Sequence, residues 1–161
     1  GKKRIYYISL GNKQKGISYT EKINEASPNP AIRVASSNPY YVHDRIPSYE
    51  EALIYAIKQR DVRYLIASLA LFRKISDWSL LYKLAKKEDL IREVAALYEI
   101  ARKVVGKVRK MPKRFLHLAQ KRDGPFHYIV SRLSSDDFKD TEKRWKVYIP
   151  LNRADLEEYN R

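Results

Sequence analysis

The stretch SYEEALIYAIKQRDVRYLIASLALFRKISDWSLLYKLAKKEDLIREVAALYEIARKVVG, residues 48–106, decides the fold. It opens with Ser48 and Glu51 at the spacing of a capping box, directly after Pro47. In such a box the Ser hydroxyl accepts from the backbone N–H of the Glu, and the Glu carboxylate accepts from the backbone N–H of the Ser. The pattern therefore predicts a helix over about 49–60.

Four further helices are predicted from signals of the same kind. Capping side chains precede apolar residues at helical spacing three times, at Asp61, at Ser76 or Asp77, and at Asp89. Pro112 stands where the first turn of a fifth helix would begin. The expected spans, in chain order, are 61–74, a helix from about 77, 89–105 and 112–121. Since the apolar residues of the first of these cover more than one face, we expect it to be the most buried helix.

The two ends of the chain favour strands. The segment 2–10 is rich in β-branched and aromatic residues and runs into Gly11-Asn12, which predicts a strand and a turn. Ser134–Asp137 has the residues to cap a short helical turn, and Asn152 resembles the cap of a last helix. Further strands are expected at 31–35, 40–43, 126–133 and 145–151.

The predicted fold class is α+β, a cluster of about five helices over 48–122 flanked by strands at both ends. Three parts are expected along the chain. A strand and loop-rich segment covers 1–47 and the helical domain covers 48–122. A mixed strand and helix part, 123–161, is expected to pack on the same domain.

The composition excludes several classes of protein. The chain has 161 residues and no Cys, which rules out a disulfide scaffold, Cys-ligated zinc, an iron–sulfur cluster and a Cys nucleophile. Its longest apolar stretch, around Tyr64–Phe72, is shorter than the roughly 20 residues that span a bilayer, and the first residues do not resemble a signal peptide. Many Lys, Arg, Glu and Tyr suit a protein from a hot environment, such as an archaeon. We expect a soluble, cytoplasmic protein without a membrane partner.

The charge is concentrated in two places. The formal net charge is +14, from 33 Lys and Arg against 19 Asp and Glu. The largest share lies in residues 102–122, here called the basic segment, which carries nine basic residues and no acidic one: Arg102, Lys103, Lys107, Arg109, Lys110, Lys113, Arg114, Lys121 and Arg122. A second share lies before residue 48 and includes Lys2, Lys3 and Arg4. Such clusters favour phosphate backbones, because each contact releases condensed counterions.

Within the basic segment, one spacing predicts a continuous stripe. Lys103, Lys107, Lys110 and Arg114 recur three or four residues apart, so an unbroken helix would place all four on one face. Pro112 is expected to bend that helix. We predict that all twelve basic residues contact nucleic acid, most simply duplex DNA, with no cofactor and no metal ion.

An enzymatic alternative rests on one spacing. Arg122 and His127 are separated by four residues, and this resembles the R-x4-H motif of HEPN ribonucleases. The resemblance implies RNA cleavage, with the Arg and His acting on the 2′-hydroxyl and the phosphate. This sequence departs from the family at Gly124-Pro125, because the family's motif begins a helix and these two residues favour a turn. The other histidines, His43 and His117, form no metal-ligand spacing.

Two resemblances point to regulation instead. The segment KKRIYYISL, residues 2–10, looks like the wing of a winged helix, whose recognition helix would then lie before Gly1 in a longer protein. Residues 48–105 resemble the helical part of AbiEi-like antitoxins, in which helices like 48–58, 77–85 and 90–105 follow one another. That family implies a winged helix joined to an α+β domain, repression of its own operon and neutralisation of a nucleotidyltransferase toxin.

The expected function is that of a non-enzymatic, nucleic-acid-associated regulator, similar to an antitoxin or a transcriptional repressor, which binds the phosphate backbone with its basic face. HEPN-like RNA cleavage is one alternative. A protein-interaction module is the other, with the helical face around Trp78 and Tyr82 binding a cognate protein or a second copy of the chain.

Overall fold

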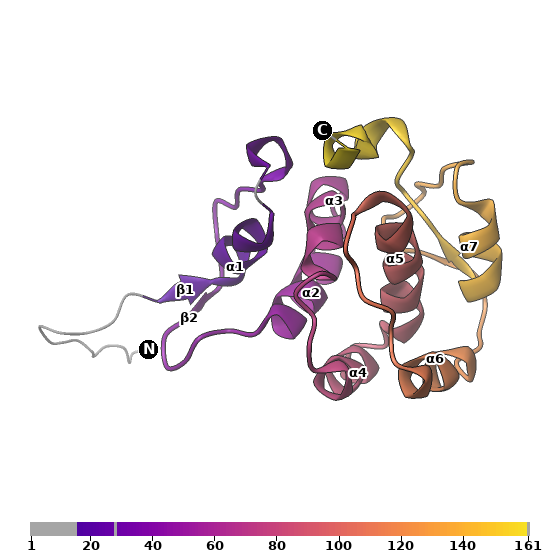
Figure 1. The fold of residues 1–161 in the computed structure, drawn as a ribbon, viewed down its shortest axis with the longest axis horizontal. Helices are drawn as coiled ribbons and strands as arrows, with labels where there is room; N and C mark the ends of the chain where they lie inside the picture. Colours follow the sequence, from indigo (N-terminus) through magenta and orange to yellow (C-terminus); the bar gives the residue numbers. More distant parts are fainter. Residues whose placement is uncertain (1–15, 28, 161) are drawn as a thin grey trace, which may run out of the picture.

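The computed structural model describes residues 16–27 and 29–160, in which helices predominate and strands are short (Figure 1). The α-helices are α1 (Tyr19–Ala26), α2 (Tyr49–Lys58), α3 (Val62–Leu71), α4 (Trp78–Lys87), α5 (Ile91–Val104), α6 (Lys113–Gln120) and α7 (Lys139–Trp145). Two 3-10 helices are η1 (Pro30–Ile32) and η2 (Ala154–Asn160). The strands are β1 (Ile17–Ser18), β2 (Tyr41–Val42), β3 (His127–Tyr128) and β4 (Val147–Tyr148). The α+β class with a helical cluster is confirmed.

The predicted caps explain where three of the helices begin. The capping box of α2 is present, because Ser48 Oγ accepts from the Glu51 amide and Glu51 accepts from the Ser48 amide. Asp61 accepts from two amides in the first turn of α3. Asp77, rather than Ser76, is the N-cap of α4 and accepts from the Leu80 amide. The side-chain oxygens thus satisfy N–H groups that a helix leaves without partners.

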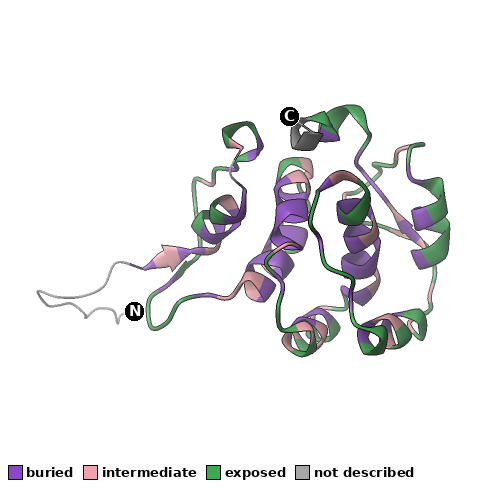
Figure 2. Cartoon of the chain, viewed as in Figure 1, coloured by how far each residue is buried: buried purple, intermediate pink, exposed green. Residues whose placement is uncertain are grey.

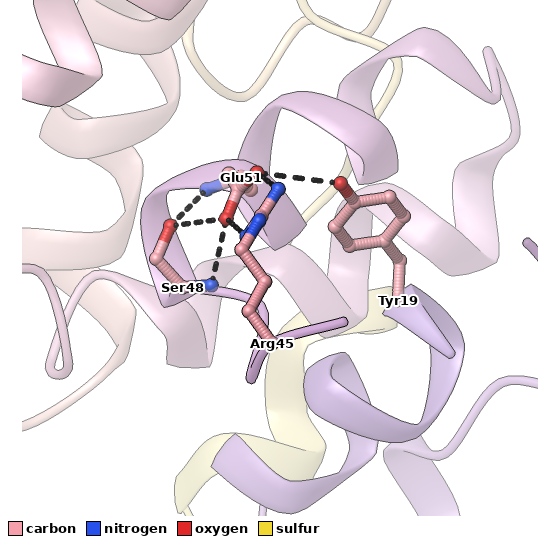
Figure 3. A network of polar contacts seen from close by, with 4 residues as sticks. All are labelled: Tyr19, Arg45, Ser48 and Glu51. Carbon is pink, nitrogen blue, oxygen red and sulfur yellow. Dashed lines mark hydrogen bonds and ion pairs between the residues drawn. The ribbon is translucent and has the colours of Figure 1, made fainter. Parts of the chain in front are cut away.

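The carboxylate of Glu51 does more than cap its helix (Figure 3). It accepts from both terminal nitrogens of Arg45 at 2.6 Å, and the hydroxyl of Tyr19 lies 3.4 Å from Oε2. The bonds from Arg45, followed by those from the amide and hydroxyl of Ser48, lower the pKa of Glu51 to about 2 against the effect of burial. One carboxylate therefore joins α1, the segment before α2 and the start of α2 itself.

Several boundaries differ from the expected ones. Asp89 does not cap α5: it takes a left-handed backbone conformation with φ of 56°, and Leu90 is the N-cap without a side-chain hydrogen bond. Pro112 is the N-cap of α6 rather than a residue of its first turn. The positive φ of Asp89 turns the chain between α4 and α5 sharply, so its carboxylate makes no cap.

Helix α1 was not predicted, although its sequence carries the same signal as α2. Ser18 and Glu21 form a complete capping box, with Ser18 Oγ accepting from the Glu21 amide and Glu21 Oε1 accepting from the Ser18 amide. The surrounding Gly, Pro and Asn residues indicated a loop. The box stabilises the short helix, and packing of Ile23 into the core completes it.

The strands are shorter than predicted. β1 and β2 pair antiparallel, and β3 and β4 pair parallel with His127 opposite Val147. The strand expected at 31–35 is wrong, because η1 occupies its start. Most of 126–133 lies outside β3, and α7 ends at Trp145, the expected first residue of a strand. The turn expected after Ser134–Asp137 is the full helix α7, and its N-cap is Phe138. The strand and wing predicted at 2–10 lie outside the described residues.

The core centres on α2, α3 and α5, whose facing sides are buried (Figure 2). One hydrophobic cluster extends from Ile23 in α1 to Leu156 in η2. As expected, Asn152 caps the last helical turn, since its side chain accepts from the Asp155 amide at 3.0 Å. None of the described helices has both the length and the apolar character needed to cross a membrane. The helices α4 and α6 lie at the edge of this core and present their outer faces to solvent (Figure 2).

Candidate nucleic-acid interface

The basic segment leaves α5 and returns along it before α6 begins (Figure 1). Two side chains of α5 hold the returning chain. Arg102 Nη1 donates to the carbonyl of Val108 at 2.6 Å, and the hydroxyl of Tyr98 accepts from the amide of Met111 at 2.7 Å. Since Tyr98 precedes Arg102 in α5, the connection 105–112 runs antiparallel to the helix. It therefore forms a strap fixed to the surface of α5.

The nine predicted cations do not form the helical stripe that their spacing suggested. Helix α5 ends at Val104, and Lys107 turns the chain with a φ of 66°. Gly106 and this turn end the helix, and Pro112 then starts a new one. Along the chain the segment contributes Arg102 and Lys103 in the last turn of α5, Lys107, Arg109 and Lys110 in the strap, Lys113 and Arg114 in the first turn of α6, and Lys121 and Arg122 at its end.

These side chains nevertheless share one property. All are exposed except Arg122, which is half-buried, and within the described residues none of the nine forms an ion pair. Some cations elsewhere do form ion pairs: Arg45 pairs with Glu51, Lys58 with Glu88 and Lys146 with Asp123. The basic segment is thus an exposed and uncompensated positive surface. Lys2, Lys3 and Arg4 lie outside the described residues.

A groove between α4 and α6 extends this surface. The two helices lie side by side, and the groove between them has a volume of about 570 Å³. Its aromatic lining is Trp78 and Tyr82 from α4 and Phe115 from α6. The ring centroids of Trp78 and Tyr82 lie 5.0 and 6.0 Å from that of Phe115, both edge to face. We call this the α4–α6 groove. It contains the two residues around which the sequence predicted a binding face.

Three buried or partly buried carboxylates have structural partners. Glu50 accepts from the amides of Ser76 and Asp77 and so satisfies the start of α4. Glu142 accepts from the amide of Ile149 at 2.7 Å and from two side chains. Glu99 binds three side chains of α7. These hydrogen bonds give all three acids a structural role.

Glu93 is different, and sequence reasoning missed it. It is 1 % exposed, and its Oε2 lies 3.0 Å from Nε2 of the half-buried His127. Yet neither Glu93 oxygen nor this nitrogen makes a well-oriented hydrogen bond within the described residues. The sequence did contain a signal for its burial. Glu93 lies three residues before Ala96 and four before Leu97, which places it on the apolar face of α5.

Burial sets the protonation of this pair. It raises the pKa of Glu93, against the attraction of nearby Arg60 and Arg92. Burial also lowers the pKa of His127, and the same two arginines lower it further, while Asp89 opposes them. Both shifts favour the neutral form, in which a carboxylic acid faces a neutral imidazole. Such a buried acid beside a histidine resembles catalytic pairs in its chemistry.

Glu93→Gln is expected to stabilise the protein most at high pH. The pKa of Glu93 is higher in the folded chain than in the unfolded chain, so ionisation destabilises the fold as the pH rises from about 4.5 through the folded pKa. Gln keeps the neutral shape and does not ionise. Urea unfolding of both proteins between pH 4.5 and 8 measures the difference, at about 1.4 kcal/mol per pKa unit. A difference that stays constant with pH, or favours wild type at pH 8, would contradict a neutral pair.

Arg122 and His127 make different contacts. Arg122 follows the last turn of α6, and its amide donates to the carbonyl of Ala119. His127 begins β3 and faces Glu93 instead. Within the described residues no hydrogen bond joins the two, and no group of three or more His, Asp or Glu is placed to hold a metal ion. HEPN-like RNA cleavage stays a prediction without geometric support.

Comparison of the chain with models of protein families, with curated proteins and with solved structures finds no match in any of the three. The resemblance of residues 48–105 to AbiEi-like antitoxins stays a prediction.

Proposed function

We propose that this protein is a non-enzymatic, nucleic-acid-associated regulator that contacts the phosphate backbone through its basic segment. The single observation that carries the proposal is the run of nine cations that form no ion pair with any described residue, eight of them exposed. A surface selected only for solubility mixes both signs of charge. This segment contains no acid over 21 residues.

The physical basis is counterion release. Lys and Arg side chains that neutralise phosphates displace condensed cations from the nucleic acid, and this favours binding at low salt. Such contacts position a protein on its target and carry no sequence information directly. The strap contributes to this role, because Arg102 and Tyr98 fix its backbone and so limit the freedom that its lysines lose on binding.

The more specific parts of the proposal come from the sequence. Residues 48–105 resemble AbiEi-like antitoxins, which suggests a regulator that represses transcription and binds a cognate toxin. The composition suggests an archaeal, thermophilic source and a cytoplasmic location. Duplex DNA is the proposed target, since the resembling family acts through a winged helix.

A salt titration tests the proposal. The full chain is titrated into a fluorescently labelled 20-base-pair DNA duplex at several salt concentrations between 50 and 300 mM. The logarithm of the binding constant is expected to fall linearly with the logarithm of the salt concentration, by about 0.9 for each phosphate contact. The proposal predicts at least four contacts. Absence of binding at 50 mM salt, or binding that salt does not weaken, would overturn it.

A further inference from the structure

The α4–α6 groove exposes part of its aromatic lining to solvent. Phe115 lies at its base and is 2 % exposed, whereas Trp78 and Tyr82 are half-buried and border the open space. Their edge-to-face packing on Phe115 fixes the orientation of both rings. The groove volume of about 570 Å³ lies within the range of pockets that bind small ligands.

All the charged side chains that line the α4–α6 groove are basic. Lys83 and Lys86 from α4 and Arg114 from α6 line it, and its lining includes no acidic residue. All three cations are exposed and form no ion pair within the part of the chain that the structure describes. Arg114 also belongs to the basic segment. The groove is therefore continuous with the surface proposed to bind phosphates.

We infer that the α4–α6 groove binds an unpaired base of single-stranded nucleic acid, whose adjoining phosphates contact Lys83, Lys86 and Arg114. Grooves that bind single strands combine positive charge along the backbone with aromatic side chains on which bases stack. The α4–α6 groove has both. The inference rests on the proposed nucleic-acid contact and adds that an unpaired base in the groove strengthens it.

A comparison of two strands with equal charge tests the inference. One is a dodecamer of thymidine nucleotides, and the other is a dodecamer of abasic nucleotides that carries the same phosphates. The full chain is expected to bind the thymidine strand at least about tenfold more tightly, because stacking of one base on aromatic side chains is worth about that much. The duplex of the same length serves as a reference in which bases are paired.

Three variants locate the preference. Tyr82→Leu keeps the apolar volume but removes a ring, so it is expected to abolish the preference and leave binding of the abasic strand unchanged. Ser79→Leu narrows the groove from an exposed position of α4 and is expected to do the same with little effect on folding. Lys83→Gln with Lys86→Gln is expected to weaken binding of both strands equally. Circular dichroism during heating checks that each variant is folded.

The outcomes separate the two proposals. Equal, salt-dependent binding of both strands by the wild-type protein would overturn the inference and leave backbone contact intact. Failure to bind the two strands and the duplex alike would overturn both. A dimer in light scattering that Ser79→Leu converts to a monomer would assign the groove to a second copy of the chain and overturn the inference.

Discussion

Replacing Lys103, Lys107, Lys110 and Lys113 together by Gln is expected to weaken duplex binding about a thousandfold at 50 mM salt. These lysines come from the end of α5, from the strap and from the first turn of α6, and all four are exposed and form no ion pair with the residues that the structure describes. Each lost phosphate contact removes about 0.9 from the slope of log K against log salt. The slope is therefore expected to flatten by about 3.6, and titrations of both proteins at several salt concentrations measure it.

A charge-matched control separates this surface from the overall net charge. Changing Arg33, Lys74, Arg132 and Lys143 to Gln removes the same charge from exposed positions outside the basic segment. This control is expected to lower the affinity only slightly, because Debye screening weakens charges at a distance. Equal losses in the two variants would show that net charge alone attracts the nucleic acid, and the basic segment would then have no special role.

Glu99→Ala is expected to lower the free energy of unfolding by about 3–4 kcal/mol. One carboxylate accepts from the indole nitrogen of Trp145 at 2.7 Å, from the hydroxyl of Thr141 at 3.0 Å and from Arg144. Trp145 is 3 % exposed and Thr141 is fully buried. Removal of Glu99 leaves both donors without a partner, and each such loss costs about 1–3 kcal/mol. Urea unfolding followed by circular dichroism measures the effect.

Two milder variants show which of these bonds matters. Arg144→Ala is expected to cost less than about 1 kcal/mol, because the side chain of Arg144 is 55 % exposed and exposed ion pairs contribute little. Glu99→Gln retains one acceptor oxygen and is expected to fall between the other two. If Arg144→Ala destabilised the protein as much as Glu99→Ala, the ion pair rather than the buried donors would hold α7 to α5.

The helices were predictable where a capping side chain precedes them. Asp61 and the box of Ser48 and Glu51 are local signals, and the helices start where they indicate. Ser18 and Glu21 carry the same signal, so α1 could have been found from the sequence. Helix α7 has no side-chain cap, and it depends on burial of Trp145 and on its bonds to Glu99, which is 46 residues away. Such long-range contacts leave no local pattern.

The candidate site was predictable in composition but not in shape. The acid-free run shows directly in the sequence, and its exposure follows from its charge. The path of the segment could not be predicted. Its return along α5 depends on hydrogen bonds that the Tyr98 hydroxyl and the Arg102 guanidinium make with the backbone of the strap. The two lysines of α4 join the same surface only because α4 packs beside α6. Because these lysines are far from Arg114 in the sequence, no local pattern predicted that they share one surface with it.

The two tryptophans of the chain occupy contrasting environments. Trp145 is enclosed between α5 and α7 with its indole N–H bound to a carboxylate, whereas Trp78 borders the open α4–α6 groove. Indole emission shifts to longer wavelength as water reaches the ring, so Trp78 is expected to emit at longer wavelength than Trp145. The chain thus carries its own pair of optical reporters, one for the integrity of its interior and one for occupancy of its surface.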